Sequence, residues 1–189
     1  MKQLSILIAN DDGIFSDGIY ALWEAMAEIG KTTVVAPNTE KSAVGHAITL
    51  SDPIRIEKVK RSGGFSGYAV NGTPADSVKI AVKAIMDKKP DIIISGINAG
   101  ANIGQSLLYS GTISAATEGT FLGIPSIAIS LNSLKGGDWS GAKMVAQKVV
   151  KSVLEHELPN GTLLNVNVPN IPENEFRGYQ ITQQGSIYF

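Results

Sequence analysis

The chain has 189 residues, of which 43% are hydrophobic and 17% are charged, and its formal net charge is −1. This length suits one domain with at most a small extension, and the near-neutral charge gives no reason to expect binding to nucleic acid or an anionic membrane. The chain has no cysteine, which excludes disulfides and thiolate ligands and fits a reducing compartment. No apolar run approaches the roughly 20 residues that span a bilayer, and the N-terminus lacks the pattern of a secretory signal. We therefore expect a cytoplasmic protein without a membrane partner.

Short apolar runs alternate with helical patterns along the chain. The runs that predict strands are residues 4–9, 32–36, 53–59, 65–70, 91–95, 125–130 and 162–168, with 179–182 as a candidate for one more. The patterns that predict helices are residues 17–29, a segment that begins after Thr73, 112–122 and 138–154, and a glycine-rich loop covers 96–111. In the second helix, Thr73 is the expected N-cap, Pro74 the first helical residue and Asp76 a carboxylate in the first turn.

Strands that alternate with helices predict parallel pairing through crossover helices. We therefore predict an α/β fold, a three-layer α/β sandwich with a Rossmann-like, mostly parallel sheet. The strands at 53–59 and 65–70 would form a small β-hairpin excursion around Ser62-Gly63-Gly64. Residues 1–168 would form one Rossmann-like domain, and the less periodic residues 169–189 would form a C-terminal arm.

Two adjacent carboxylates, Asp11 and Asp12, stand where the first strand should end. One of them could cap the next helix, but Ser16 and Asp17 lie closer to the expected helix start. Hard divalent cations such as Mg²⁺ and Mn²⁺ prefer carboxylates together with neutral oxygens. A second interpretation of the pair is therefore a cation site at the strand end, with Gly13 allowing the backbone to turn.

Polar residues also follow two other predicted strands, in the segments 37–42 and 95–98. In open parallel sheets, ligands bind outside the carboxyl ends of the strands. If the strands are parallel, these segments and the acidic pair share one edge of the sheet. The predicted helix at 112–122 begins at the same edge.

The glycine-rich segment "SGINAGANIGQSLLYSGTISAATEG" ends in a helix start at Tyr109–Thr112. Backbone N–H groups there, together with the hydroxyls of Ser110 and Thr112, would make an anion site, although an ordinary glycine-rich turn with a Ser/Thr cap explains the same residues. The fingerprints G-x-G-x-x-G, G-x-x-x-x-G-K-[ST] and G-x-S-x-G are absent from the expected places. A cation site beside a phosphate site predicts phosphoryl chemistry in which a cation-activated water attacks phosphorus.

Five blocks of the sequence, taken in order, resemble the SurE (survival protein E) family of metal-dependent nucleoside 5′(3′)-monophosphate phosphatases. The blocks are "NDDG", "VVAPNTEKSAVGHAITL", "NGTPADSV", "PDIIISGINAGANIG" and "YSGTISAATEG". The resemblance implies one divalent cation per subunit, Mg²⁺ or Mn²⁺ with Ca²⁺ as another ion that could bind. The ligands that it implies are Asp11, Asp12, Ser42 and Asn98, and it implies catalytic roles for Asp11, Asp12 and Asn98.

The same resemblance implies a phosphate-binding set of Ser110, Gly111 and Thr112, with Asn102 nearby. It also implies a nucleoside monophosphate as substrate, a homodimer or homotetramer, and a C-terminal extension that exchanges between subunits. The general acid or base does not follow from the motifs; His46, near Ser42 in sequence, is a candidate that could reach the leaving group or could be incidental. Two other functions stay open, which are a phosphatase with an aspartyl-phosphate intermediate and a nucleotide-binding module without turnover.

Overall fold

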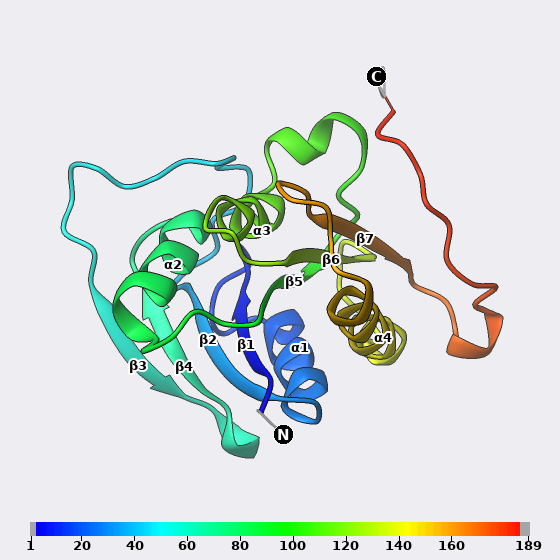
Figure 1. Ribbon diagram of the computed structural model, residues 1–189, viewed down its shortest axis with the longest axis horizontal. Coiled ribbons are helices and arrows are strands. Elements are labelled where there is room, and N and C mark those ends of the chain that lie inside the picture. The colour runs from blue at the N-terminus through cyan, green and yellow to red at the C-terminus, as the bar shows by residue number, and fades with distance from the viewer. Residues whose placement is uncertain (1–2, 186–189) are drawn as a thin grey trace.

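A seven-stranded sheet forms the middle layer of the computed structural model, which describes residues 3–185 (Figure 1). Its strand order within these residues is β3-β4-β2-β1-β5-β6-β7, and every neighbouring pair is parallel except β3, which is antiparallel to β4. The strands are β1 (Ser5–Ala9), β2 (Lys31–Pro37), β3 (Ile56–Lys60), β4 (Ser66–Val70), β5 (Ile92–Ala99), β6 (Ser126–Asn132) and β7 (Leu164–Pro169). The mostly parallel sheet and the β3–β4 hairpin confirm the predicted fold class.

α-Helices of the described residues cover both faces of the sheet (Figure 1). They are α1 (Asp17–Ala27) and α4 (Ser140–His156) on one face, and α2 (Pro74–Ile80) and α3 (Gly111–Phe121) on the other. The central strand β1 shows why the sheet needs both layers. Ile6 and Ile8 pack under α1 and α4, whereas Leu7 and Ala9 pack under α2 and α3, and all four are fully buried. A strand that is buried on both faces has the continuous apolar run that the sequence shows here.

Side chains fix the starts of the helices at the carboxyl edge of the sheet. The hydroxyl of Ser16 accepts a hydrogen bond from the backbone N–H of Ile19 at the start of α1. At the start of α2, the Thr73 hydroxyl accepts from the Asp76 N–H while the Asp76 carboxylate accepts from the Thr73 N–H. This reciprocal capping, with Pro74 as the first helical residue, confirms the prediction from "NGTPADSV".

The structure differs from the sequence prediction in two places. Residues 179–182 form no strand, and the described part of the chain beyond β7 has only a 3₁₀ turn at Glu173–Glu175. In contrast, β5 continues to Ala99 through residues that were predicted as loop. After a shift in register, Asn98 lies opposite Ser130 in β6, so pairing with a central neighbour keeps this glycine-containing stretch extended. No helix in residues 3–185 is long and apolar enough to cross a membrane.

Gly119 provides a test of how closely α3 packs on the sheet. A Cβ at this position would lie 2.4 Å from Ser126 Oγ and 2.7 Å from Ile93 Cδ1. Helix propensity alone predicts that Gly119→Ala stabilises the protein by about 1 kcal/mol. We expect the opposite, a loss of about 1–3 kcal/mol in the free energy of unfolding, because the methyl group overpacks the interface.

Urea unfolding measures this change. Ser152→Ala, on the exposed surface of α4, is the control and should change stability by less than about 0.5 kcal/mol. A stabilising Gly119→Ala would show that α3 can move away from the sheet at little cost.

Candidate functional site

The turn after β1 is anchored to its surroundings on both sides. The backbone N–H of Lys41 donates to the carbonyl of Asp11 at 2.7 Å, which ties the loop after β2 to the acidic pair. Asn10 is fully buried, and its Nδ2 donates to the Gly13 carbonyl and to Ser16 Oγ. The positive φ of Gly13, 95°, lets the chain turn back toward α1. The acidic pair therefore occupies a turn that its neighbours hold in place.

Asp11 is held against the first turn of α3. It is only 4% exposed, and Thr112 Oγ1 donates to its Oδ1 at 2.6 Å. A Cβ at Gly111 would lie 2.6 Å from the Cβ of Asp11, so only glycine permits this approach. The N-terminus of a helix favours a negative charge, and the short Thr112 bond adds to that attraction.

Both aspartates have raised pKa values. Burial raises the pKa of Asp11, against the effect of hydrogen bonds from Thr112 and from backbone groups at 111 and 112. Burial first, and then the neighbouring charge of Asp11, raises the pKa of Asp12 to about 6. The backbone N–H of Ala99 lowers this pKa, whereas Glu40 raises it slightly. Two crowded carboxylates of this kind repel each other, and a divalent cation would relieve the repulsion.

Ser42 lies on the loop that follows β2, and Asn98 is the penultimate residue of β5; each carries an oxygen atom that a cation could use. The Ser42 hydroxyl donates to Glu40 Oε1 at 2.7 Å, so its lone pairs remain available. The Asn98 Nδ2 donates to the Gly100 carbonyl at 2.6 Å, which leaves its Oδ1 as an acceptor. Residues 3–185 contain no group of three or more His, Cys, Asp and Glu that could hold a metal. Two carboxylates with a hydroxyl and an amide oxygen nevertheless fit a hard cation, because such ions accept neutral oxygens.

Glu40 is a member of this cluster that the sequence analysis did not identify. It lies near enough to Asp12 to affect the pKa of Asp12, and its Oε1 accepts a hydrogen bond from the Ser42 hydroxyl. Its position two residues before Ser42 was the available signal, but an exposed glutamate in a polar loop has no distinguishing pattern.

The predicted phosphate-binding residues form hydrogen bonds with different partners in the structure. Ser110 caps α3, since its Oγ accepts from the Ile113 N–H at 3.1 Å and keeps its own proton to donate. The Thr112 hydroxyl donates to Asp11. Asn102 has other partners, because its Nδ2 donates to Ser130 Oγ and its backbone is held by Asn167 of β7. The role of each in phosphate binding stays a prediction.

His46 contacts α3 well beyond that helix's first turn. Its Nε2 lies 3.1 Å from Oε2 of the buried Glu118, and its ring stacks on Phe121 with 5.5 Å between centroids. Lys79 of α2 approaches the other oxygen of Glu118 at 3.3 Å. These contacts orient the imidazole toward the middle of α3, and the suggested role of His46 at the leaving group stays untested.

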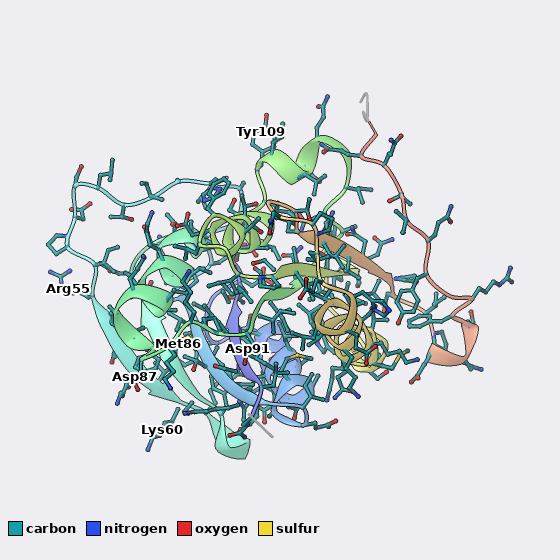
Figure 2. All side chains as sticks on the ribbon, viewed as in Figure 1. Arg55, Lys60, Met86, Asp87, Asp91 and Tyr109 are labelled. Atoms are coloured by element: carbon teal, nitrogen blue, oxygen red, sulfur yellow. The ribbon has the colours of Figure 1, made fainter. Side chains whose placement is uncertain are left out.

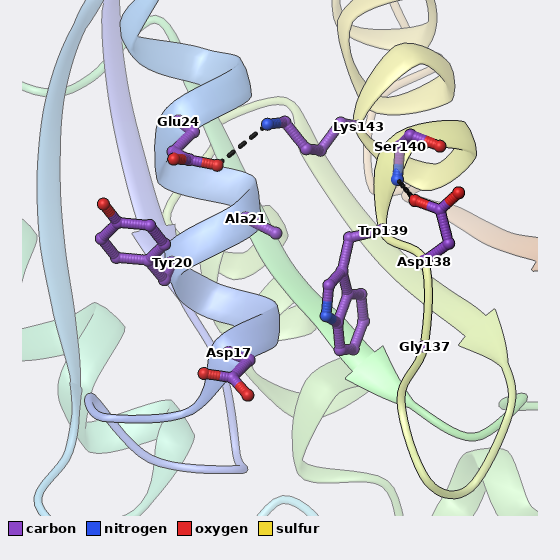
Figure 3. A pocket seen from close by; sticks show the side chains of 9 residues that line it. All are labelled: Asp17, Tyr20, Ala21, Glu24, Gly137, Asp138, Trp139, Ser140 and Lys143. Carbon is purple, nitrogen blue, oxygen red and sulfur yellow. Dashed lines mark hydrogen bonds and ion pairs between the residues drawn. The ribbon is translucent and has the colours of Figure 1, made fainter. Parts of the chain in front are cut away.

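A separate groove of about 460 Å³ lies between α1 and the start of α4 (Figure 3). Its walls include Tyr20 and Trp139, and its charged groups have partners. Lys143 Nζ lies 2.9 Å from Glu24 Oε2, and the Ser140 N–H donates to Asp138 Oδ1 at 2.9 Å. None of the predicted cation or phosphate residues lines this groove.

Comparison with known proteins identifies the family. The model of the family "Survival protein SurE" matches residues 6–189. The chain belongs to the SurE family. It is 50% identical to the 5′-nucleotidase SurE of Syntrophobacter fumaroxidans, over 97% of this chain and 74% of that protein. It is 49% identical to the 5′-nucleotidase SurE of Chlorobium chlorochromatii, over 96% of this chain and 66% of that protein.

A solved structure agrees with this assignment. The crystal structure of the SurE protein from Aquifex aeolicus superposes with a TM-score of 0.89 at 43% identity, over 96% of this chain and 73% of that one. The chain thus spans roughly two thirds to three quarters of the length of these relatives. The family assignment made from five sequence blocks is confirmed.

The raised pKa of Asp12 predicts how stability depends on pH. The folded state holds the Asp12 proton more tightly than the unfolded state, with a pKa of about 6 against the ordinary 3.8. With chelator present, ionised Asp12 therefore lowers the free energy of unfolding. This loss is absent below about pH 4 and reaches its full size above about pH 6. Asp12→Asn removes the charge, so we expect its melting temperature at pH 7.5 to exceed the wild type by roughly 2–6 °C, with the difference vanishing near pH 4.

Differential scanning fluorimetry across pH tests this expectation. Asp138→Asn is the matched control, because the Ser140 N–H lowers the pKa of Asp138 and its charge is favourable in the folded state. That variant should gain no stability at pH 7.5. If the wild type and Asp12→Asn have the same melting temperature at pH 7.5, the ionised Asp12 does not destabilise the folded state.

Proposed function

We propose that the chain is a 5′-nucleotidase that hydrolyses nucleoside 5′(3′)-monophosphates to nucleoside and phosphate with the help of a divalent cation. The observation that carries the proposal is the buried pair Asp11 and Asp12, with Asp11 bonded to Thr112 of α3. Lys41, next to Ser42, donates to the Asp11 carbonyl, and Ala99, next to Asn98, donates to Asp12. Relatives that are about half identical over nearly the whole chain are named 5′-nucleotidase SurE. We also propose a cytoplasmic location and a homodimer or homotetramer, as the family resemblance implies.

Asp11, Asp12, Ser42 and Asn98 would hold one cation, Mg²⁺ or Mn²⁺. When bound, the cation lowers the pKa of a coordinated water and neutralises charge on the phosphoryl group. The geometry supports unequal roles for the two carboxylates. Asp11 is buried and tied to Thr112, so it serves as a fixed anchor. Asp12 is partly exposed, and the Ala99 backbone N–H is the donor that lowers its pKa, so Asp12 can face both the cation and the substrate.

The first turn of α3 would bind the phosphoryl group. The Ser110 hydroxyl can donate, and the backbone N–H groups at the helix start carry partial positive charge. Because Asp11 already uses the Thr112 hydroxyl, Ser110 and the backbone at Gly111 are the groups best suited to orient the phosphoryl oxygens. This arrangement would position phosphorus beside the carboxylate pair, where charge neutralisation is needed.

An aspartyl-phosphate mechanism receives less support from the same geometry. Its nucleophile would be one of the two aspartates, and Asp11 is buried with an oxygen committed to Thr112. A nucleotide-binding module without turnover remains a third outcome, which the assay below distinguishes from both enzymes.

Phosphate release from AMP, GMP and UMP, with Mn²⁺ or Mg²⁺ and with EDTA, tests the proposed function. We expect turnover that chelation abolishes and that Mn²⁺ or Mg²⁺ restores. Asp12→Asn should lower kcat/KM by about 10²-fold or more, which corresponds to roughly 3 kcal/mol of lost transition-state stabilisation.

Asp138→Asn, outside the site, should retain full activity. Turnover that is unchanged in EDTA would contradict the cation requirement, and a covalent phosphoenzyme trapped on an aspartate would favour the alternative mechanism. Nucleotide binding by calorimetry, without phosphate release under any cation, would identify a binding module.

A further inference from the structure

The loop between β2 and β3, residues 38–55, has no helix or strand, yet it carries Ser42. Most of its side chains are exposed, and Leu50 is 85% exposed, so little apolar burial fixes its position. A long segment of this kind needs specific polar contacts to keep one conformation. Such contacts occur on both sides of Ser42.

Four sets of contacts fasten the loop to α2, to α3 and to the residues just before these helices. The Gly45 N–H donates to the carbonyl of Tyr109, which Figure 2 places on the segment before α3. The Thr73 hydroxyl donates to the carbonyl of Ala47 at 2.8 Å. The Thr49 hydroxyl and N–H both donate to the buried carboxylate of Asp76. The remaining contact is that of His46 with α3.

The His46 contact differs from the other three because it involves a buried charge. Glu118 is 5% exposed, and its two carboxylate oxygens face His46 Nε2 at 3.1 Å and Lys79 Nζ at 3.3 Å. A buried carboxylate that loses one of two partners is less well compensated, so Glu118 favours the imidazole in this place even though the His46 side chain is 29% exposed. Phe121 adds a stacked ring on the same side, with 11° between the planes.

Ser42 lies between two fixed points of this loop. On one side Lys41 donates to the Asp11 carbonyl, and on the other Gly45 and His46 are held by Tyr109 and α3. The segment between them is short, so its geometry follows from the positions of both ends. Loss of the His46 contact would leave this end to the Gly45 bond, and the weaker hold would let Ser42 leave the carboxylates more often.

We propose that His46 is a positioning residue, which holds Ser42 at the cation site by binding Glu118 and Phe121 of α3. The proposal rests on the proposed function in one respect, since it takes Ser42 as a ligand of the divalent cation. It assigns no proton transfer to His46, in contrast to the role suggested by its place near Ser42 in the sequence. The imidazole acts through the conformation of the loop.

The first test is the affinity for Mn²⁺, measured by calorimetry without substrate. Releasing the loop lowers the fraction of molecules in which Ser42 is in place, so the apparent dissociation constant should rise in His46→Ala by about 5- to 30-fold. At saturating Mn²⁺, kcat for AMP should change by less than about threefold, because the site is then assembled. His46→Gln, which can still donate to Glu118, should recover part of the affinity.

The second test is a double-mutant cycle with Ser42→Ala. If His46 acts through Ser42, the effect of His46→Ala on Mn²⁺ affinity should largely disappear in the Ser42→Ala background. His156→Ala is the matched control, because the other histidine of the chain is exposed on α4 and contacts only the Ser152 carbonyl in the structure as described. Phe121→Ala, at a position that is 74% exposed, weakens the same contact from α3 with little risk to folding and should shift the affinity in the same direction.

The outcomes separate this proposal from the proposed function. Additive effects of His46→Ala and Ser42→Ala, or unchanged Mn²⁺ affinity in His46→Ala, would overturn it. A large loss of kcat at saturating Mn²⁺ with unchanged affinity would also overturn it and would assign His46 to the chemistry. If the wild type binds Mn²⁺ but releases no phosphate, the proposed function fails while the affinity cycle still tests the loop. Hydrogen exchange of residues 38–51, which should become faster in His46→Ala, tests the loop even without any cation.

Discussion

The contact between Asp11 and the start of α3 is the constraint on which the site depends. A carboxylate that is almost fully buried must find compensation, and here the Thr112 hydroxyl and the positive end of a helix provide it. This contact requires glycine at position 111, because any Cβ there would collide with Asp11. It also fixes the distance between β1 and α3, so Asp11 and the first turn of α3 belong to one rigid unit.

Much of this arrangement follows from the sequence, because strand ends in a parallel sheet must meet at one edge. Apolar runs and caps located the strands, the helix starts and the residues that follow each strand, as Asp11 and Thr73 illustrate. Family resemblance then supplied the reason to choose Ser42 and Asn98 among many polar loop residues. Neither residue has a local pattern that separates it from its neighbours.

What the sequence could not provide is the choice of partner for each polar group. The sequence does not show that the Thr112 hydroxyl binds Asp11, or that the Asn102 amide binds Ser130 of β6. Such pairings depend on how two distant segments approach each other, and periodicity carries no information about that approach. The candidate strand at 179–182, which the structure does not have, was wrong for a similar reason. Composition alone cannot show whether a neighbouring strand exists to pair with it.

The two carboxylates and Ser42 are positioned in different ways. Asp11 and Asp12 are held together against their mutual repulsion by rigid elements, so their geometry is set before any cation arrives. Ser42, by contrast, lies on a loop whose position depends on contacts made several residues away. The rigid pair of carboxylates would provide most of the affinity for the cation. The adjustable loop with Ser42 would control access to the cation site. The buried Glu118 is one of the residues that link the loop to α3, whose first turn contacts Asp11 and whose later turns contact the loop.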